Sequence, residues 1–441
     1  MRPLLAFTGS RGDAQPGILL ARALRERGHD VTVALAPNLV AFAHDHGIRA
    51  VPFGRDTAGL LAAQRTDHRF AGRDPRARLR ALFELQRRGV PEQLEDLRAL
   101  APGHDVVVAG MAGEEAAESV ARALGLPFAA VHFFPIQPNS AVPVVPARWA
   151  SRLPGFVHRG GWSALARARA AALAPVLPTR PQSGRAATAS SVAPAGTGPD
   201  PATTRIQAYD PALFPGVRRQ LPGPFTGFLI DVDGFLTAAQ SSADPTLPSA
   251  GDQTTALESW LDSGTAPIYV GFGSMDVGDP AAFVAMLRQV CARRGRRLLL
   301  ASGWSTVAAG FEDAVAIVGQ VDHARVLPRC VAAVHHGGAG TTAAALRAGV
   351  AQVICSVQAD QPYWGQALQR LGLAVTIPAK QLTGERLDAL LDRVSRPEVV
   401  LRAASYATTV ATDGVERAAD AIEALAGTPA TADLHSAGRQ S

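Results

Sequence analysis

Two runs of residues in the C-terminal half combine groups that could hold a phosphorylated sugar. The first, His335–Thr342, reads HHGGAGTT and follows the apolar run Cys330–Val334, which predicts a short buried strand. The residues after it predict a helix that ends at Gly349. The glycines therefore lie on a strand-to-helix turn, where free N–H groups and the helix dipole favour a phosphate. A histidine beside this turn could donate a further hydrogen bond to a diphosphate.

The second run, Gln358–Trp364, follows another apolar stretch, Gln352–Cys355. Its Asp360 and Gln361 stand before Pro362, which is typical of a loop at the start of a helix. A carboxylate next to a carboxamide offers acceptors and donors that suit vicinal sugar hydroxyls. Tight helix–strand packing would explain a glycine turn standing alone. Two such runs at the carboxyl ends of predicted parallel strands indicate a ligand site instead.

The elements that must position these runs alternate between strand and helix. In the N-terminal half, Leu4–Phe7 predicts a strand, residues 8–15 a polar loop, and Pro16 opens a helix that runs through Arg27. Further strands are expected at Val31–Leu35, Asp105–Ala109, Phe128–Phe133 and Ile206–Tyr209. In the C-terminal half, strands are expected at Ile268–Phe272, Arg297–Leu300 and Ala314–Val318, and helices near 281–293 and 397–426. The pattern predicts an α/β fold of two Rossmann-like parallel-sheet domains that face a central cleft.

Composition along the chain divides it into domains. We expect an N-terminal domain at 1–240, in which 178–204 is a mobile loop because it is rich in Ala, Ser, Thr, Pro and Gly. A linker is expected at 241–255 and a C-terminal domain at 256–426, whose last helix is free to pack back on the first domain. Residues 427–441 predict a disordered tail.

Overall composition excludes several classes of protein. The chain has 441 residues, 47% of them hydrophobic and 18% charged, with a net charge of only +5. No basic stripe with interleaved aromatics indicates a nucleic-acid partner. Three cysteines, an odd number, indicate neither a disulfide framework nor a metal site. Because the apolar N-terminal run is too short for a signal peptide and no run is long enough to span a membrane, we expect a cytoplasmic protein without stable membrane insertion. We also expect a monomer or weak dimer.

The two runs, together with Thr8–Pro16 and Gly271–Met275, resemble motifs of the family 1 glycosyltransferases of the GT-B fold. The resemblance is closest to bacterial antibiotic glycosyltransferases of the vancomycin group and to the sterol glucosyltransferase branch. It covers nearly the whole chain and is clearest at 1–55 and 265–380. The region 55–225 is where members of this family diverge.

The resemblance implies that the domain at 1–240 binds the acceptor and that the domain at 256–426 binds the nucleotide sugar. It also implies a role for each motif. Asp13 stands where this family places its catalytic base, and Ser10 and Phe134 would lie on the acceptor side. Asp360 and Gln361 would hold the donor sugar. The residues implied to bind the donor diphosphate are Ser274, His335, Gly337, Gly338, Gly340 and Thr341. Those implied to bind the nucleoside are Trp304, Gln320 and Val321.

The implied reaction is a direct, inverting displacement. An acceptor hydroxyl, helped by a carboxylate base, attacks the sugar of a UDP- or dTDP-sugar co-substrate while the diphosphate leaves. Helix-end amides and His335 would stabilise the leaving charge without a metal or other cofactor. One departure from plant members is Ala109-Gly110, which stands where they often carry a second Asp that orients a catalytic histidine.

Other readings of the same residues remain open at this level. Asp13 could be a helix cap only. The pair Asp231 and Asp233 resembles a metal-binding Asp-x-Asp but is interpreted as surface charge. We expect His336 to be a packed or supporting histidine, and Trp364 to lie in the core. Alternative functions are a sugar-nucleotide epimerase of the same fold and a non-catalytic partner protein.

Overall fold

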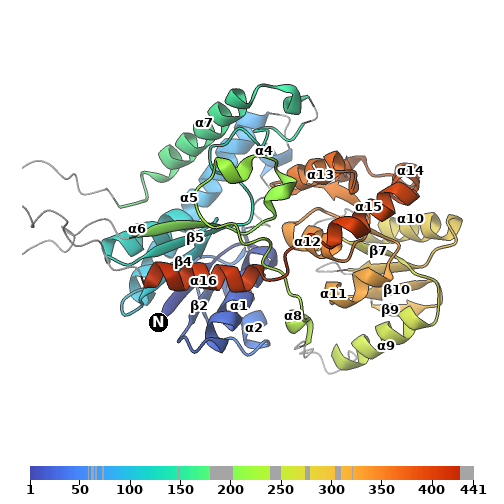
Figure 1. Ribbon diagram of the computed structural model, residues 1–441, viewed down its shortest axis with the longest axis horizontal. Helices are drawn as coiled ribbons and strands as arrows, with labels where there is room; N and C mark the ends of the chain where they lie inside the picture. Colours follow the sequence, from blue (N-terminus) through green and yellow to red (C-terminus); the bar gives the residue numbers. More distant parts are fainter. Residues whose placement is uncertain are drawn as a thin grey trace, which may run out of the picture.

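The computed structural model describes residues 1–57, 59–60, 64, 67–71, 74–147, 149–178, 202–238, 250–273, 279–302, 309–319 and 321–427. These residues form two α/β halves, each built on its own sheet (Figure 1). Among them, no helix is long and apolar enough to cross a membrane.

The N-terminal sheet has the order β3-β2-β1-β4-β5-β6, and every neighbouring pair is parallel. Both faces of this sheet are covered. Leu5 and Phe7 pack on one side with helix residues such as Ile18, while Leu4 and Ala6 pack on the other with Leu97. Burial on both faces explains the continuous apolar runs of the strands. The strands are β1 (Pro3–Phe7), β2 (Thr32–Leu35), β3 (Ala50–Pro52), β4 (Val106–Gly110), β5 (Phe128–His132) and β6 (Thr203–Gln207).

The helices of this half lie on both faces of the sheet and around its edges (Figure 1). They are α1 (Arg11–Glu26), α2 (Pro37–His44), α4 (His68–Ala71), α5 (Pro75–Leu100), α6 (Glu114–Ala123), α7 (Gly155–Leu173) and α8 (Phe235–Ala238), with short 3₁₀ helices η1 (Ala150–Arg152), η2 (Pro211–Leu213) and η3 (Val217–Arg219).

The first helix begins earlier than the sequence predicts. Ser10 is the residue that precedes α1, and the helix starts at Arg11 and continues through Pro16. Asp13 closes this first turn by accepting hydrogen bonds from Ser10. Pro16 lies inside the helix, beyond its first turn, and has no N–H to donate to the carbonyl four residues before it. The predicted loop at 8–15 is therefore wrong in its second half.

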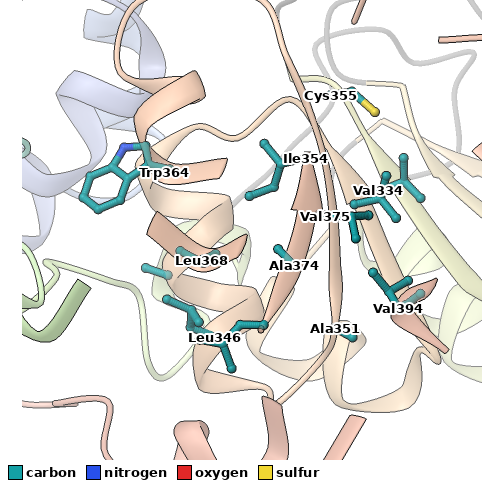
Figure 2. Packing of buried hydrophobic residues seen from close by; sticks show 14 of the residues in the cluster. Val334, Leu346, Ala351, Ile354, Cys355, Trp364, Leu368, Ala374, Val375 and Val394 are labelled. Carbon is teal, nitrogen blue, oxygen red and sulfur yellow. The ribbon is translucent and has the colours of Figure 1, made fainter. Parts of the chain in front are cut away.

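The C-terminal sheet has the order β13-β12-β11-β7-β8-β10-β9, and only the β9–β10 pair is antiparallel. Its strands are β7 (Ile268–Gly271), β8 (Leu298–Ala301), β9 (Gly310–Glu312), β10 (Val315–Val318), β11 (Ala332–His335), β12 (Gln352–Ser356) and β13 (Ala374–Pro378). Figure 2 shows part of the core: Val334, Ile354 and Val375 of neighbouring strands lie near Leu346, Leu368 and Trp364 of two helices.

The helices of this half are α9 (Ala250–Asp262), α10 (Pro280–Arg293), α11 (His323–Val326), α12 (Ala339–Arg347), α13 (Gln361–Arg370), α14 (Gly384–Val394), α15 (Pro397–Ala407) and α16 (Gly414–Ala426), with η4 (Leu327–Arg329) and η5 (Ala379–Gln381). The long helix predicted at 397–426 is thus two helices. The second, α16, returns to the N-terminal half, where Ala418, Ile422 and Leu425 join the core beside α1 (Figure 1).

Two predicted loop boundaries also differ. The loop placed at 178–204 runs too far, because Thr203 and Thr204 belong to β6 and pair with Phe128 and Ala129. This strand lies at the sheet edge and begins with exposed polar residues, so it lacks the apolar signal of a buried strand. The linker placed at 241–255 overlaps α9, which begins at Ala250. The rest of both segments, 179–201 and 239–249, and the tail from 428 lie outside the described residues.

The return of α16 depends on a close main-chain contact, which gives a stability prediction. A Cβ added to Gly414 would lie inside van der Waals contact with the carbonyl oxygen of Phe228. Gly414→Ala is therefore expected to destabilise the protein by about 1–3 kcal/mol, the usual cost of overpacking. Gly160→Ala is the matched control, since a Cβ there meets nothing within 4 Å. Denaturant unfolding that ranks the two variants equally would contradict the contact.

Candidate active site

Asp13 is held at the carboxyl end of β1 by a tight turn. Its Oδ2 accepts hydrogen bonds from the main-chain N–H of Ser10 at 2.7 Å and from the Ser10 hydroxyl at 2.9 Å. Gly9 turns the chain with a φ of +127°, and a Cβ there would collide with the Asp13 carboxylate. Thr57 fixes the turn by donating to the carbonyl of Gly9 at 2.6 Å. The turn thus presents a carboxylate, and Oδ1 has no hydrogen-bond partner among the described residues.

The environment makes Asp13 a stronger base than an exposed aspartate. Burial raises its pKa to about 6, although both hydrogen bonds from Ser10 oppose the shift. The negative charge of Asp360 raises the pKa further. Asp360 belongs to the C-terminal half, so the two carboxylates predicted to be functional lie close enough across the junction of the halves for their charges to interact.

Asp360 and Gln361 form the start of α13. The Oδ2 of Asp360 accepts a hydrogen bond from the buried indole of Trp364 at 2.7 Å. Burial raises the pKa of Asp360, and this hydrogen bond opposes the rise. The side-chain oxygen of Gln361 accepts from the main-chain N–H groups of Val357 at 2.8 Å and Gln358 at 3.1 Å. Gln361 thus fixes the loop that carries Asp360.

The residue before Asp360 is strained. Ala359 has a φ of +55° and is the one non-glycine residue with positive φ in the described part of the chain. A left-handed alanine costs of order 1–3 kcal/mol and persists only where its surroundings enforce it. Here the two hydrogen bonds to Gln361 hold the loop in that shape. Strain of this kind is typical of loops that bind a ligand.

The glycine turn lies directly against the Asp360 loop. Gly337 has a φ of +89°, and a Cβ there would lie 2.6 Å from the Ile354 side chain and 3.3 Å from the carbonyl oxygen of Gln361. Gly338 precedes α12 in an extended conformation. Gly340 is exposed in the first turn of α12, where a Cβ would meet nothing within 4 Å, and Thr341 beside it is partly buried. The glycines therefore allow close packing and also leave the start of the helix open.

His335 does not have the geometry that the resemblance implies. It is fully buried at the end of β11, its Nδ1 accepts from the N–H of Gly337 at 3.1 Å, and its Nε2 lies 2.9 Å from Oε1 of Gln352. Burial, with a smaller effect from His336, lowers its pKa to about 3, so the ring is neutral and Nε2–H donates to Gln352. Both ring nitrogens are used in this structure, so His335 supports the glycine turn and presents no free N–H to a ligand there.

Two residues that the sequence analysis did not assign to the diphosphate are His336 and Arg11. His336 is partly exposed, and its ring lies 3.3 Å from a Cβ position on Gly273 and 2.5 Å from one on Gly338. Its Nδ1 is buried and makes no hydrogen bond of ordinary geometry among the described residues, although the main chain of Gly271 is close enough to oppose the effect of burial on the ring. Burial lowers its pKa. The signal in the sequence was the second histidine of the pair, which was interpreted as a supporting residue.

Arg11 is the second unassigned residue. Its guanidinium lies over the Phe42 ring at 4.0 Å, and its Nε has no partner in the described structure. Burial lowers its pKa to about 10, which leaves it a cation at neutral pH. The pKa of His323 is lowered to about 4, mainly by burial. Repulsion from His336 and from Arg11 acts in the same direction. Arg11 of the N-terminal half therefore lies near His323 of the C-terminal half.

The remaining predicted residues divide into three groups. Ser274, Trp304 and Gln320 lie outside the described residues. The side chain of Val321 is buried in a core cluster with Leu257 and Trp260, so it is not available to a nucleoside. Phe134 is 3% exposed and packs against aromatic residues of both halves, so it does not line an open acceptor pocket as predicted. Its neighbours are Trp162, Phe214, Tyr363 and Trp364.

That aromatic cluster joins the two halves beside the site. Tyr363 of α13 packs on Phe134 and donates its hydroxyl to the carbonyl of Val144 at 2.8 Å. Trp364 is completely buried, which confirms the prediction that it belongs to the core. The helix that carries Asp360 is thus fixed against the half that carries Asp13. Among the described residues, no group of three or more His, Cys, Asp or Glu side chains could hold a metal ion.

The amino-acid sequence is similar to those of known glycosyltransferases. Residues 302–417 match the family model for the C-terminal domain of erythromycin biosynthesis protein CIII-like proteins. An uncharacterized glycosyltransferase of Mycobacterium tuberculosis is 34% identical over 96% of this chain and 98% of its own length. The vancomycin aglycone glucosyltransferase of Amycolatopsis orientalis is 29% identical over 95% and 96%.

Solved structures show the same fold. The calicheamicin glycosyltransferase CalG4 superposes with a TM-score of 0.65 at 17% identity, over 98% of this chain and 99% of that one. The glycosyltransferase VinC, solved in complex with dTDP, gives a TM-score of 0.63 at 21% identity, over 97% and 99%.

Proposed function

The chain belongs to the family 1 glycosyltransferases of the GT-B fold, and from this premise we propose that it transfers a sugar, with inversion, from a UDP- or dTDP-sugar to a hydroxyl of a hydrophobic small molecule. The observation that carries the proposal is the pair Asp13 and Asp360, which come from the two halves and lie close enough for their charges to interact. One carboxylate lies on the acceptor side as the base, and the other lies on the donor side, where it would hold sugar hydroxyls.

The proposed step follows from this placement. The acceptor hydroxyl gives its proton to Asp13 as its oxygen attacks the anomeric carbon. The bond from that carbon to the diphosphate oxygen breaks, and the electron pair leaves with the diphosphate. Ser10 holds Oδ2 of Asp13, so Oδ1 is the oxygen that takes the proton. General-base assistance of this kind contributes about 10²–10⁴-fold to a rate.

The leaving diphosphate would be stabilised from both halves. The open start of α12 offers free N–H groups and the positive end of the helix dipole. His336, with its unpartnered Nδ1, would donate from the C-terminal half in place of His335. Arg11 would add a full positive charge from the N-terminal half. These groups are what we propose in place of a metal cation.

The function is tested by mass spectrometry of products from a panel of hydrophobic acceptors incubated with UDP-glucose and with dTDP-sugars. A glycosylated acceptor of inverted anomeric configuration is the expected product. Free epimerised sugar formed from the donor alone would instead indicate the epimerase alternative. Failure of every donor to bind or to be hydrolysed would indicate a non-catalytic protein.

Activity should persist without metal. We expect excess chelator to leave kcat unchanged, because Arg11 and the amides of α12 supply the positive charge near the diphosphate. The measurement is turnover after chelation and after adding back Mg²⁺ or Mn²⁺. Loss of activity that either cation restores would show that the proposed donors are insufficient.

The pKa of Asp13 predicts the pH profile. A base must be deprotonated, so kcat/KM should fall as the pH drops below about 6, where Asp13 binds its proton. An aspartate of ordinary pKa would lose activity only near pH 4. Asp360→Asn removes the neighbouring charge, so its residual activity should persist to lower pH than that of the wild type. A wild-type profile that is flat down to pH 4.5 would exclude Asp13 as a base with this pKa.

A further inference from the structure

A cluster of large apolar side chains is exposed between residues 149 and 157. The exposed fractions are 59% for Trp149, 37% for Leu153, 76% for Phe156 and 36% for Val157. Trp149 and Leu153 flank η1, and the other two lie in the first turn of α7. Scattered exposed apolar residues are ordinary, but four within nine residues form a patch of the kind that marks an interaction site.

The segment that carries this patch is held rigidly. Trp162 of α7 is buried and donates its indole N–H to the carbonyl of Val142 at 2.9 Å. Gly155 packs so closely on Ser140 that a Cβ would lie 2.9 Å from its side chain. Ala150 is also buried. The exposure of Trp149 and Phe156 is therefore a property of a packed structure.

The segment of sequence that carries the patch has charge of one sign. Between Glu118 and Asp200 the sequence contains eight arginines and no aspartate or glutamate. On α7, Phe156, Arg159, Ser163 and Arg167 recur at helical spacing along the solvent-facing side. Arg152, Arg159 and Arg167 are exposed, and none has a carboxylate partner in the parts of the chain that the structure describes.

A groove beside α7 extends this surface to α5, and Figure 1 shows the two helices side by side. It has a volume of about 440 Å³. Leu79, Phe83, Ala168 and Ala172 supply apolar walls, and Arg76, Arg80 and Arg87 stand around them. The one carboxylate of the lining, Glu84, is paired with Arg69. An apolar channel bordered by guanidinium groups matches the chemistry of an acyl chain that ends in an anionic headgroup.

We propose that this surface, formed by residues 149–167 and the α5–α7 groove, docks on an anionic lipid bilayer. Trp149 and Phe156 would insert at the level of the headgroups, and the arginines would pair with lipid phosphates. A second copy of the chain is a poorer occupant, because a symmetric dimer through this patch would place like charges against each other. The docking is independent of the proposed sugar transfer, since it uses none of the residues assigned to the reaction.

The experiment is cosedimentation of the full chain with lipid vesicles. Wild-type protein should bind vesicles that contain phosphatidylglycerol and should not bind pure phosphatidylcholine. Binding should weaken as salt shortens the range of the charge interactions. Removing each arginine should lower the partition coefficient roughly fivefold, so Arg152→Gln/Arg159→Gln should lower it about 25-fold. The double variant Trp149→Ser/Phe156→Ser should abolish stable binding.

A matched pair on the other half provides the control. Leu401 on α15 is 70% exposed, and Arg396 precedes that helix, so Leu401→Ser/Arg396→Gln should bind vesicles as the wild type does. Melting temperatures should be unchanged in all variants, because the substituted side chains are exposed. Equal binding to neutral vesicles, no binding, or equal loss in the control pair would overturn the proposal. So would a dimer that the Trp149/Phe156 variant abolishes while vesicle binding is absent.

Discussion

Asp13→Asn is expected to lower kcat by about 10²–10⁴-fold, the range that a general base contributes. The asparagine side chain has nearly the same shape, and its oxygen can still accept both hydrogen bonds from Ser10. The variant should therefore fold normally and lose only the ability to take a proton. Turnover is measured at saturating donor and acceptor, and donor affinity is measured by calorimetry.

The control is the nucleotide itself. UDP or dTDP should bind the Asp13→Asn variant as tightly as the wild type, because Asp13 is placed on the acceptor side. Ser10→Ala is a graded companion, since it removes the 2.9 Å hydroxyl contact and keeps the main-chain one. That variant should shift the acidic limb of the pH profile upward. Near-normal turnover in Asp13→Asn would mean that the carboxylate only caps α1.

His336→Ala is expected to lower kcat by about 10²-fold, the cost of losing one hydrogen-bond donor to charge that develops in the transition state. His336 is the histidine of the pair that has an unpartnered nitrogen beside Gly273 and Gly338. Its loss should affect donors and nucleotide diphosphates together. Steady-state kinetics with varied donor, and calorimetry with UDP, measure both effects.

The neighbouring histidine provides the contrast. His335→Ala should lower stability by about 1–3 kcal/mol, because the N–H of Gly337 and the amide of Gln352 would each lose a buried partner. Donor binding by the folded protein should change less than in His336→Ala. If His335→Ala instead abolished donor binding at unchanged stability, the assignment implied by the resemblance would stand and ours would fail.

The sequence predicted those features that local chemistry determines. The backbone gives a direct reason for the continuous apolar strands, for glycine at strand-to-helix turns and for proline beside Asp360. The α/β architecture of two parallel-sheet domains that these features predict is confirmed. The order of the motifs was also sufficient to identify the family. Periodicity within a segment carries the strands and helices, whereas the family came from the resemblance of four separate motifs.

The sequence failed where a neighbour distant in the chain decides the outcome. The close approach of α16 to the carbonyl of Phe228 requires a glycine at 414, and nothing near Gly414 in the sequence announces that contact. Edge strand β6 begins with polar residues that only its pairing with β5 identifies as a strand. Phe134 was assigned to the acceptor, but the aromatic residues that bury it come from α7, η2 and α13.

The same division applies within the site. The sequence by itself determined which residue types lie at the carboxyl ends of the strands in the two sheets. A carboxylate follows β1. A histidine pair, glycines, an aspartate and a glutamine lie at the ends of β11 and β12. Only the tertiary structure decided which of the adjacent histidines is available. Successive residues of a strand end point to opposite sides, so His335 meets Gln352 of the next strand while His336 meets Gly273. It also brought Asp13 close enough to Asp360, and Arg11 close enough to His323, for their charges to interact, because those distances depend on how two separately folded sheets dock.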